Sequence, residues 1–296
     1  MNDRLTPHCY LNGDWVPLAQ ASVSVLDRGF IFGDGIYEVV PVYSGVPFRA
    51  PEHYQRLVRS LKEVGIPLPF DEKGFTELLQ GLIQHPGAPA ATDHTVYLQI
   101  TRGVAPRVHA APPGLTPTVF AMLQPLSLPN AHDLTHGVRC VSAPEFRWDK
   151  GHIKSTSLLG AVLAREISVQ QQATETILFR DDWLTEGSAS NVWIVQAGRV
   201  LGVPKNGSVL EGIRYGLIES LCQQLGLPFE LRPISRAEVF AADELMISSA
   251  SKEVLAVTQL DDARIGTGVP GPIWQRLHAA YQAAKAELIA AAQARA

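Results

Sequence analysis

Hydrophobic residues recur along the chain with two different periods, and each period predicts one kind of element. In residues 51–65, Leu57, Leu61 and Val64 follow the spacing of one helix face, and Gly65 marks the end of that helix. The same signals predict further helices over residues 70–85, 157–172 and 212–226, and from about Pro272 onward. Each of these helices has an apolar face that needs a partner.

Other segments are rich in β-branched and aromatic residues, which predicts strands. A hairpin is expected around Asn12 and Gly13, a pair typical of tight turns. The remaining strand-forming segments are residues 35–49, 94–103, 116–126, 137–146, 175–203 and 243–251. Because strands and helices come in mixed order rather than in regular alternation, the pattern predicts an α+β fold.

The length of 296 residues predicts two domains, because a single apolar core usually stops growing near this size. Residues 125–132 contain prolines and polar residues and are the expected linker. They would join an N-terminal domain, residues 1–124, to a C-terminal domain, residues 133–296. A composition of 46% hydrophobic and 18% charged residues is that of a folded globular chain.

Charge and cysteine content narrow the expected partners. The formal net charge is −4 and no long basic run occurs, so neither nucleic acid nor an anionic membrane surface is an expected partner. Three widely separated cysteines predict neither a disulfide framework nor a thiolate metal site. The opening residues lack the apolar core of a secretion signal, and no run approaches the ~18 apolar residues of a membrane helix. The expected location is therefore the cytoplasm.

Two familiar motifs occur in the wrong context. His132 and His136 have the spacing of a zinc-binding helix, but the glutamate after the first histidine and a third ligand are missing. Residues 266–271, GTGVPG, match a dinucleotide-binding pattern, but too little chain follows for a helix, a returning strand and an acidic ribose contact. Neither a metal nor a dinucleotide is therefore expected.

Lys154 is the lysine whose surroundings point to chemistry. It lies just before the apolar helix segment 157–172, in the sequence IKSTSLLGAV, and a segment of this composition is normally buried. Burial lowers the pKa of an ammonium and favours the neutral amine, the form that attacks an aldehyde. The alternative is a lysine at a strand end with its amine in water.

Three further features suit an anion. The helix at Gly212 follows the residues LEG, and a helix N-terminus presents free N–H groups and a partial positive charge to a phosphate. Residues 248–251, SSAS, offer hydroxyls, and Arg56 can add a guanidinium. Together with a lysine that reacts with an aldehyde, these features describe a site for pyridoxal phosphate.

Several blocks of the chain carry a wider resemblance: DRGFIFGDGIYEVV, PRVH, IKSTSLLGAVLA, TEGSASNVW, LEGI, and SSAS followed by KEV. In the same order, they resemble the blocks of class IV (fold type IV) pyridoxal-phosphate aminotransferases. The chain is most similar to the D-amino-acid aminotransferase branch, from about Tyr10 to Ala280. The resemblance implies two α/β domains with pyridoxal 5'-phosphate in the cleft between them.

The resemblance also implies roles for individual residues. Lys154 resembles the Schiff-base lysine, which also moves a proton between substrate and cofactor as general base and acid. Glu186 resembles the carboxylate that keeps the pyridine nitrogen protonated. The expected phosphate-binding residues are Arg56, Ile213, Arg214 and Ser251. Family members often carry threonine where this chain has Arg214, and Ala250 replaces a hydroxyl residue. Side-chain hydrogen bonds to the phosphate are therefore either lost or supplied by the additional guanidinium.

Three residues are assigned to substrate binding by the same resemblance. Tyr37 lies on a strand whose alternation places it on the face opposite Glu38. Arg107 and His109, two residues apart, resemble the pair that traps the substrate α-carboxylate and reaches across a homodimer interface. An arginine is the natural partner of a carboxylate.

The implied reaction is ping-pong transfer of an amino group between D-amino acids such as D-alanine and 2-oxo acids such as 2-oxoglutarate. A lyase similar to aminodeoxychorismate lyase would use the same lysine and cofactor. Transaminases of branched-chain L-amino acids or of (R)-amines share the fold. The Arg107 and His109 pair favours transamination of amino acids. A cofactor-binding protein without activity is disfavoured, because the lysine, the ring acid and the phosphate-binding residues are all present.

Overall fold

The protein is described by a computed structural model covering residues 7–294, and its chain divides into two compact units. The described part of the first unit comprises residues 7–127, Ile153–Leu158 and residues 288–294, and the second unit comprises Leu128–His152 and Leu159–Glu287. The short segment Ile153–Leu158 therefore belongs to the first unit, although the chain on both sides of it belongs to the second. This segment carries Lys154.

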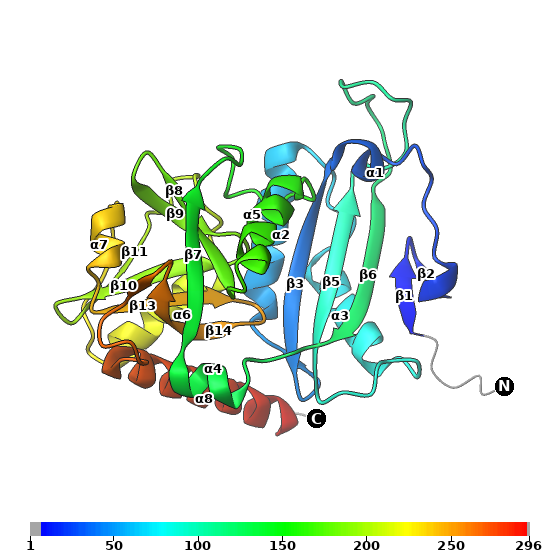
Figure 1. The fold of residues 1–296 in the computed structure, drawn as a ribbon. Coiled ribbons are helices and arrows are strands. Elements are labelled where there is room, and N and C mark those ends of the chain that lie inside the picture. Colours follow the sequence, from blue (N-terminus) through cyan, green and yellow to red (C-terminus); the bar gives the residue numbers. More distant parts are fainter. Residues whose placement is uncertain (1–6, 295–296) are drawn as a thin grey trace. The chain divides into compact units, whose positions relative to one another are not determined.

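The first unit is built on a six-stranded antiparallel sheet in the order β2-β1-β6-β5-β3-β4 (Figure 1). The strands are β1 (His8–Leu11), β2 (Asp14–Pro17), β3 (Gly35–Tyr43), β4 (Val46–Pro47), β5 (Asp93–Thr101) and β6 (Thr118–Pro125). The helices are α1 (Arg28–Phe32), α2 (Ala50–Val64) and α3 (Glu72–Gln84), with a 3-10 turn at Leu18–Gln20.

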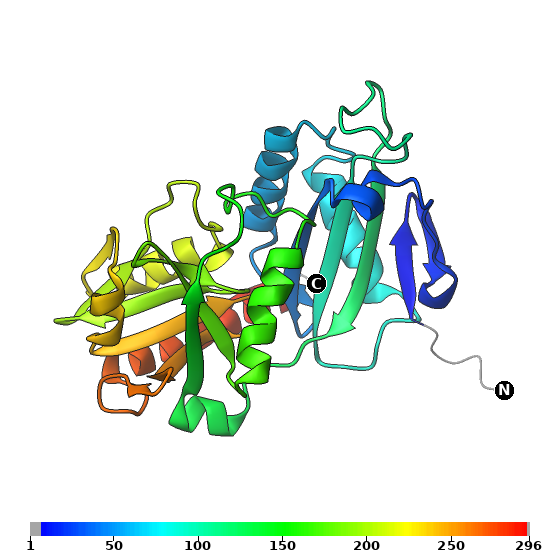
Figure 2. The same ribbon diagram turned by 45° about the horizontal axis from the view of Figure 1, so that its top comes forward.

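One face of this sheet is apolar, because every second residue of a strand points the same way. The longer helices α2 and α3 cover this face, as the two views in Figures 1 and 2 show. Their contact with the sheet forms a core that includes Ile36, Val40, Leu57, Leu61, Phe75, Leu79, Leu98 and Ile100. The packing fixes which residues of β3 and β5 point away from the helices, toward the opposite face.

The second unit is built on a nine-stranded mixed sheet in the order β12-β11-β10-β13-β14-β7-β8-β9, with β15 paired to β14. The strands are β7 (Val138–Pro144), β8 (Glu175–Arg180), β9 (Trp183–Gly187), β10 (Asn191–Gln196), β11 (Arg199–Gly202), β12 (Phe229–Leu231), β13 (Glu244–Ser249), β14 (Glu253–Leu260) and β15 (Ala263–Arg264). The helices are α4 (Ala131–His136), α5 (Leu159–Gln170), α6 (Ile213–Gln224), α7 (Arg236–Phe240) and α8 (Pro272–Gln293).

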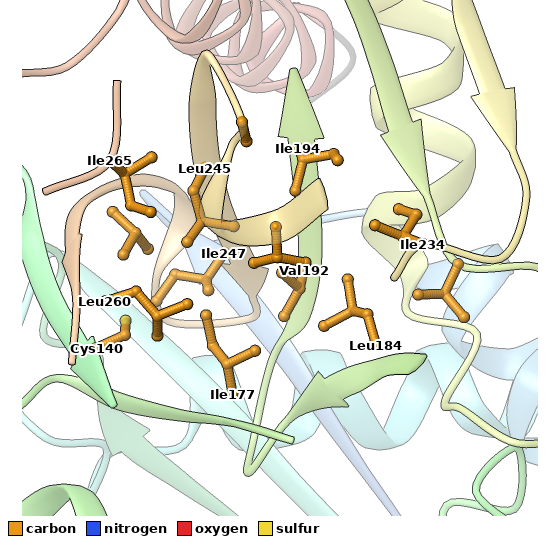
Figure 3. Packing of buried hydrophobic residues seen from close by; sticks show 14 of the residues in the cluster. Cys140, Ile177, Leu184, Val192, Ile194, Ile234, Leu245, Ile247, Leu260 and Ile265 are labelled. Atoms are coloured by element: carbon orange, nitrogen blue, oxygen red, sulfur yellow. The ribbon is translucent and has the colours of Figure 1, made fainter. Parts of the chain in front are cut away.

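The core of the second unit collects apolar side chains from neighbouring strands. Figure 3 shows Cys140, Ile177, Ile194, Leu245 and Leu260 converging between the strands that carry them. Each of these five side chains is at most 1% exposed. Full burial of such side chains stabilises the fold by roughly 1.5–3 kcal/mol each. This packing supports β13 and β14, which flank the loop of Ser251, and β8, which pairs with the strand of Glu186.

The main elements agree with the expectations from the sequence, and the mixed arrangement confirms the predicted α+β class. The helix predicted over residues 51–65 is α2, and Gly65 ends it in the left-handed conformation, with φ of 67°. Asn12 and Gly13 form the expected hairpin turn with positive φ angles of 53° and 108°. Three short helices were not expected from the sequence: α1, α4 and α7. Each is stabilised at its first turn by a polar side chain, from Asp27, Asn130 and Ser235 respectively.

The described residues, 7 to 294, contain no helix that is both long and apolar enough to cross a membrane.

Candidate active site

The candidate residues form two groups, one in each unit. Lys154 and Tyr37, together with Arg56, Arg107 and His109, belong to the first unit. The second unit holds Glu186, Ile213, Arg214 and Ser251.

Lys154 is positioned by the edge of strand β3. Its carbonyl oxygen accepts a hydrogen bond from the Tyr37 N–H at 3.0 Å, and the following residue, Ser155, forms an isolated bridge with Ile36. The Lys154 amine lies 4.1 Å from the centre of the Tyr37 ring, within the range of a cation–π contact. Within the described part of its own unit, no carboxylate forms an ion pair with it. An aromatic face therefore holds this amine without neutralising it.

Tyr37 lies on the sheet face that the helices leave uncovered, as the alternation along β3 predicted. Its ring lies 5.8 Å from that of Tyr97 on the neighbouring strand, and the Tyr97 hydroxyl donates to the Gln99 side chain at 2.7 Å. Burial and the neighbouring Tyr37 raise the pKa of Tyr97 to about 12. Beside Lys154, the surface is thus lined by aromatic rings, and Tyr97 stays protonated near neutral pH.

Arg56 is engaged in a buried ion pair inside the first unit. Its Nε and Nη2 atoms donate to the two carboxylate oxygens of Glu38 at 2.8 and 2.7 Å, and His53 contacts the same carboxylate at 2.7 Å. Burial alone would raise the pKa of Glu38, but the charge and hydrogen bonds of Arg56, together with His53, hold it well below its usual range. Glu38 therefore fixes the position of the guanidinium, and a phosphate would share Arg56 with this carboxylate.

Arg107 and His109 lie on the loop between β5 and β6, which extends beyond the end of the sheet near α1 (Figure 1). Both side chains are exposed and both contact the ring of Phe32, at centre distances of 5.6 Å for the guanidinium and 5.5 Å for the imidazole. The buried Arg28 donates to the backbone carbonyls of Val108 and His109 at 2.7 and 3.0 Å. Helix α1 thus supports the loop with one aromatic ring and one guanidinium.

Glu186 is the centre of the group in the second unit. It lies near the end of β9 and is 7% exposed. One carboxylate oxygen accepts from Arg147 at 3.1 Å; the other accepts from the Leu210 N–H at 2.9 Å and from the Asn191 amide at 3.4 Å. Although burial opposes it, the pKa of Arg147 is raised by the hydrogen bond and charge of Glu145 and by the charge of Glu186, so Arg147 stays cationic. The Glu186 carboxylate is therefore held in one orientation.

A close approach of two segments links Glu186 to the start of helix α6. The Asn191 amide also donates to the carbonyl of Leu210 at 2.8 Å. A side chain at Gly212, the residue before α6, would collide with the amide oxygen of Asn191. A Cβ at position 212 would therefore displace the Asn191 amide from its contacts. The first N–H groups of α6, at Ile213 and Arg214, follow this glycine, which has no side chain to occupy them.

The Arg214 side chain connects α6 with the loop that carries Ser251. Its Nη2 atom donates to the Ala250 carbonyl at 3.4 Å and to the Tyr281 hydroxyl at 3.2 Å, and the residue is 3% exposed. Ser251 itself is exposed. Arg214 and Ala250 are the two positions at which the sequence departs from the family, and here the Arg214 guanidinium binds the backbone of the loop that carries Ser251.

Sequence reasoning missed the residues that support the candidates: Arg28, Glu38, Arg147 and Asn191. Asn191 could have been found, because it lies within the TEGSASNVW block. No local pattern marks Arg147 as a partner of Glu186, because 39 positions separate them in sequence.

Comparison with known proteins decides the family. The family described as amino-transferase class IV matches residues 35–260, a span that contains every candidate residue. The chain belongs to the class IV aminotransferase family. This aminotransferase is 36% identical over 271 residues to a D-alanine aminotransferase of Bacillus licheniformis, covering 92% of this chain and 94% of that one. It is 37% identical over 274 residues to a D-alanine aminotransferase of Staphylococcus aureus (strain N315), covering 92% and 96%.

Solved structures show the same fold. The branched-chain amino acid aminotransferase of Escherichia coli superposes with a TM-score of 0.88 at 23% identity, covering 94% of each chain. A branched-chain aminotransferase of the archaeon Thermoproteus uzoniensis, solved with norvaline, gives a TM-score of 0.81 at 24% identity, covering 93% of each chain. A further branched-chain amino acid aminotransferase that matches this fold was solved with pyridoxamine 5'-phosphate. These structures confirm the predicted class IV fold, and the aminotransferase depends on pyridoxal phosphate, as its family does.

The residues present suit this cofactor chemically. Pyridoxal phosphate needs an amine for its aldehyde, a carboxylate for its ring nitrogen and N–H donors for its phosphate. Lys154 supplies an amine without an acid partner in the described residues of its unit. The second unit supplies a fixed carboxylate at Glu186 and a glycine-capped helix start where a side chain would collide.

Proposed function

We propose that this aminotransferase transfers the amino group between D-amino acids, such as D-alanine, and 2-oxo acids, such as 2-oxoglutarate, by a ping-pong route. The names of the relatives at 36–37% identity support the choice of substrate. The observation that carries the proposal is the paired placement of Arg107 and His109 on the Phe32 ring, with the carbonyls of Val108 and His109 held by Arg28. Such a pair is suited to bind the carboxylate of an amino acid.

Lys154 is the proposed catalytic residue. Its Nζ atom would hold the cofactor through the aldehyde carbon and, as a free amine, would take the proton from the substrate α-carbon and give a proton back. When bound, pyridoxal phosphate supplies an electron sink for the charge that develops at the α-carbon. The Tyr37 ring orients the lysine amine through the contact at 4.1 Å.

The remaining proposed contacts hold the cofactor. Glu186, fixed by Arg147 and Asn191, keeps a proton on the pyridine nitrogen. The proposed phosphate contacts are the N–H groups of Ile213 and Arg214, the hydroxyl of Ser251 and the guanidinium of Arg56. A helix start stabilises a phosphate through its unpaired N–H groups.

We also propose a homodimer. Helix α5 presents Leu159, Val162 and Leu163, which are 72%, 53% and 52% exposed and are spaced to share one helix face. Apolar side chains gathered on a surface helix mark an interaction site. In the proposed dimer, the exposed loop with Arg107 and His109 serves the active site of the other copy. The cytoplasm is the proposed location, and the three buried thiols suit its reducing conditions.

A half-reaction panel tests the substrate. The purified holoenzyme is mixed separately with D-alanine, L-alanine, L-leucine, an (R)-amine and aminodeoxychorismate, and the conversion of the yellow cofactor to its pyridoxamine form is followed by absorbance. We expect conversion with D-alanine and little with the others. Conversion with L-leucine alone would indicate a branched-chain transaminase, and pyruvate release from aminodeoxychorismate would indicate a lyase.

Subunit complementation tests the shared site. Lys154→Ala and Arg107→Ala each lower D-alanine turnover at every site of their own homodimer. In a mixed dimer, one site receives both defects and the other receives neither. We therefore expect D-alanine turnover to rise above that of either variant when the two proteins are unfolded together and refolded. No rise in refolded mixed dimers, with wild type recovering in parallel, would show that Arg107 serves its own subunit.

A further inference from the structure

Glu175 is a fully buried carboxylate that receives hydrogen bonds from two loops of the second unit. It begins strand β8, between β7 and β9 in the sheet, and is 0% exposed. An ionised carboxylate is stable in such a place only when donors satisfy both oxygens. Besides the N–H of the next residue, Thr176, the donors come from the turn that follows Glu186 and from the residue that follows Ser251.

The first loop is the turn from Gly187 to Asn191. One Glu175 oxygen accepts from the Ser188 N–H at 3.1 Å and from the Ser188 hydroxyl, and also from the Thr176 N–H at 2.9 Å. The other oxygen accepts from the Ser190 hydroxyl at 2.8 Å. Glu175 therefore fixes the backbone directly after Glu186.

The second loop is the serine loop of residues 248–253. The Lys252 amine forms an ion pair with the second Glu175 oxygen at 3.1 Å, and Lys252 directly follows Ser251. Glu253, the next residue, has a positive φ of 52° and is bound by Lys285 of α8 at 3.0 Å. A non-glycine residue in this strained conformation persists only when its surroundings hold it. The loop is thus held on both sides of its turn.

We propose that Glu175 is a positioning residue that sets the separation between Glu186 and Ser251. It acts through the turn of residues 187–191 on one side and through Lys252 on the other. This inference rests on the proposed cofactor contacts of Glu186 and Ser251. The ring nitrogen and the phosphate belong to one small molecule, so a protein that binds both must present their partners at a fixed spacing. A pre-set spacing removes the cost of ordering two loops when the cofactor binds.

The negative charge of Glu175 contributes to holding this spacing. Burial alone would raise its pKa, but the Lys252 ammonium and the hydrogen bonds from Ser188 and Ser190 hold it below the usual range. The carboxylate is therefore ionised near neutral pH. Removing one partner of the pair leaves the other buried without compensation.

The test compares ligands that occupy one or both ends of the cofactor site. The full-length chain is stripped of cofactor and titrated with pyridoxal phosphate, with pyridoxal and with inorganic phosphate. Glu175→Gln and Lys252→Met are expected to weaken pyridoxal phosphate binding by about 10-fold or more, because a linked ligand loses its advantage when its two sites are misaligned. Pyridoxal and inorganic phosphate each engage one end, so their affinities should change by less than about 3-fold. Lys252→Arg keeps the charge and should restore most of the loss.

Glu77→Gln and Lys73→Met are matched controls. They remove the same kinds of charge from an exposed pair, with side chains 63% and 82% exposed, and should leave all three affinities unchanged. Unchanged binding of pyridoxal phosphate in Lys252→Met would overturn the proposal, and so would an equal loss for all three ligands, which indicates general loosening. If Glu175→Gln does not fold, the partly exposed Lys252 carries the test alone. Failure of the proposed function is a separate result, in which the wild type itself forms no yellow adduct with pyridoxal phosphate.

Discussion

Two lysines, one in each unit, show how surroundings decide what an amine can do. Lys154 lies over the Tyr37 ring, and no carboxylate of the described residues in its unit pairs with it. Lys252 lies 3.1 Å from the buried carboxylate of Glu175. A nearby negative charge stabilises the ammonium form, which is not a nucleophile. The difference supports the proposal that Lys154, and not Lys252, is the lysine that reacts with the cofactor.

Replacing each lysine by alanine is expected to give the largest difference in D-alanine turnover and in labelling by borohydride. Lys154→Ala should lower the turnover of D-alanine by about 10²–10⁴-fold or more, because it removes the group that moves the proton. Borohydride should no longer fix the cofactor to this variant, as mass spectrometry of the intact chain would show. Lys252→Ala should still be labelled by borohydride. Both variants are labelled at a saturating concentration of pyridoxal phosphate. Labelling of Lys154→Ala, or loss of labelling in Lys252→Ala under this condition, would reverse the two assignments.

The buried carboxylate of Glu38 allows the effect of a paired charge on the free energy of unfolding to be measured. Glu38→Gln should lower the free energy of unfolding by about 3–5 kcal/mol, because it leaves Arg56 buried without its partner. The folded-state pKa of Glu38 lies below its ordinary value of 4.5, so its stabilising contribution is complete above that value and is lost as the pH falls. The difference between wild type and variant, measured by urea unfolding at several pH values, should therefore shrink in acid. A difference that grows as the pH falls would contradict this sign.

Arg107 is expected to give a smaller, substrate-dependent effect. Arg107→Ala should reduce kcat/KM for D-alanine by about 10–100-fold, because a charge-assisted hydrogen bond to the substrate carboxylate is lost. Any activity toward an amine without a carboxylate should not change. The neighbouring Val108→Ala is the control, because Arg28 binds the carbonyl at position 108 and not its side chain. Equal losses for both substrates in Arg107→Ala would point to damage to the loop.

The smallest effect is expected at Tyr37. Tyr37→Phe keeps the ring that faces the Lys154 amine and removes only the hydroxyl. Because the cation–π contact depends on the ring, labelling by borohydride should persist, and kcat should change by less than about 10-fold. Tyr37→Ala removes the ring and should reduce kcat further. Stopped-flow absorbance of the D-alanine half-reaction would compare the two, and equal rates would show that the ring has no part in placing the amine.

Most of the large elements could be predicted from the sequence. Periodic apolar residues and glycine stops indicated α2, and the Asn12–Gly13 pair indicated the first hairpin. Helix α1 could not be predicted in this way, because its five residues show no complete period and its start depends on the Asp27 side chain. Asp27 is itself held by Thr101 and Thr118, which come from β5 and β6.

The candidate site could be predicted only where its residues lie in short contiguous sequence motifs. Lys154 and Glu186 lie in such blocks, so their candidacy followed from the sequence. The ion pair of Glu38 with Arg56 depends on the packing of α2 against β3, and the pair of Glu175 with Lys252 joins residues 77 positions apart. No periodicity or motif encodes such pairs, because they arise only when the sheets assemble.

The hydrogen bonds from Arg28 to the loop after β5 have a consequence for redesigning the side chains of that loop. Arg28 binds carbonyl oxygens, which every amino acid provides, while its Nε atom is fixed by Asp34 at 2.7 Å. Side chains at positions 107 to 109 can therefore be randomised without releasing the loop, provided that the backbone path is kept. If the loop binds the substrate as proposed, libraries at these positions should change the accepted amine donor while Arg28 keeps the backbone in place.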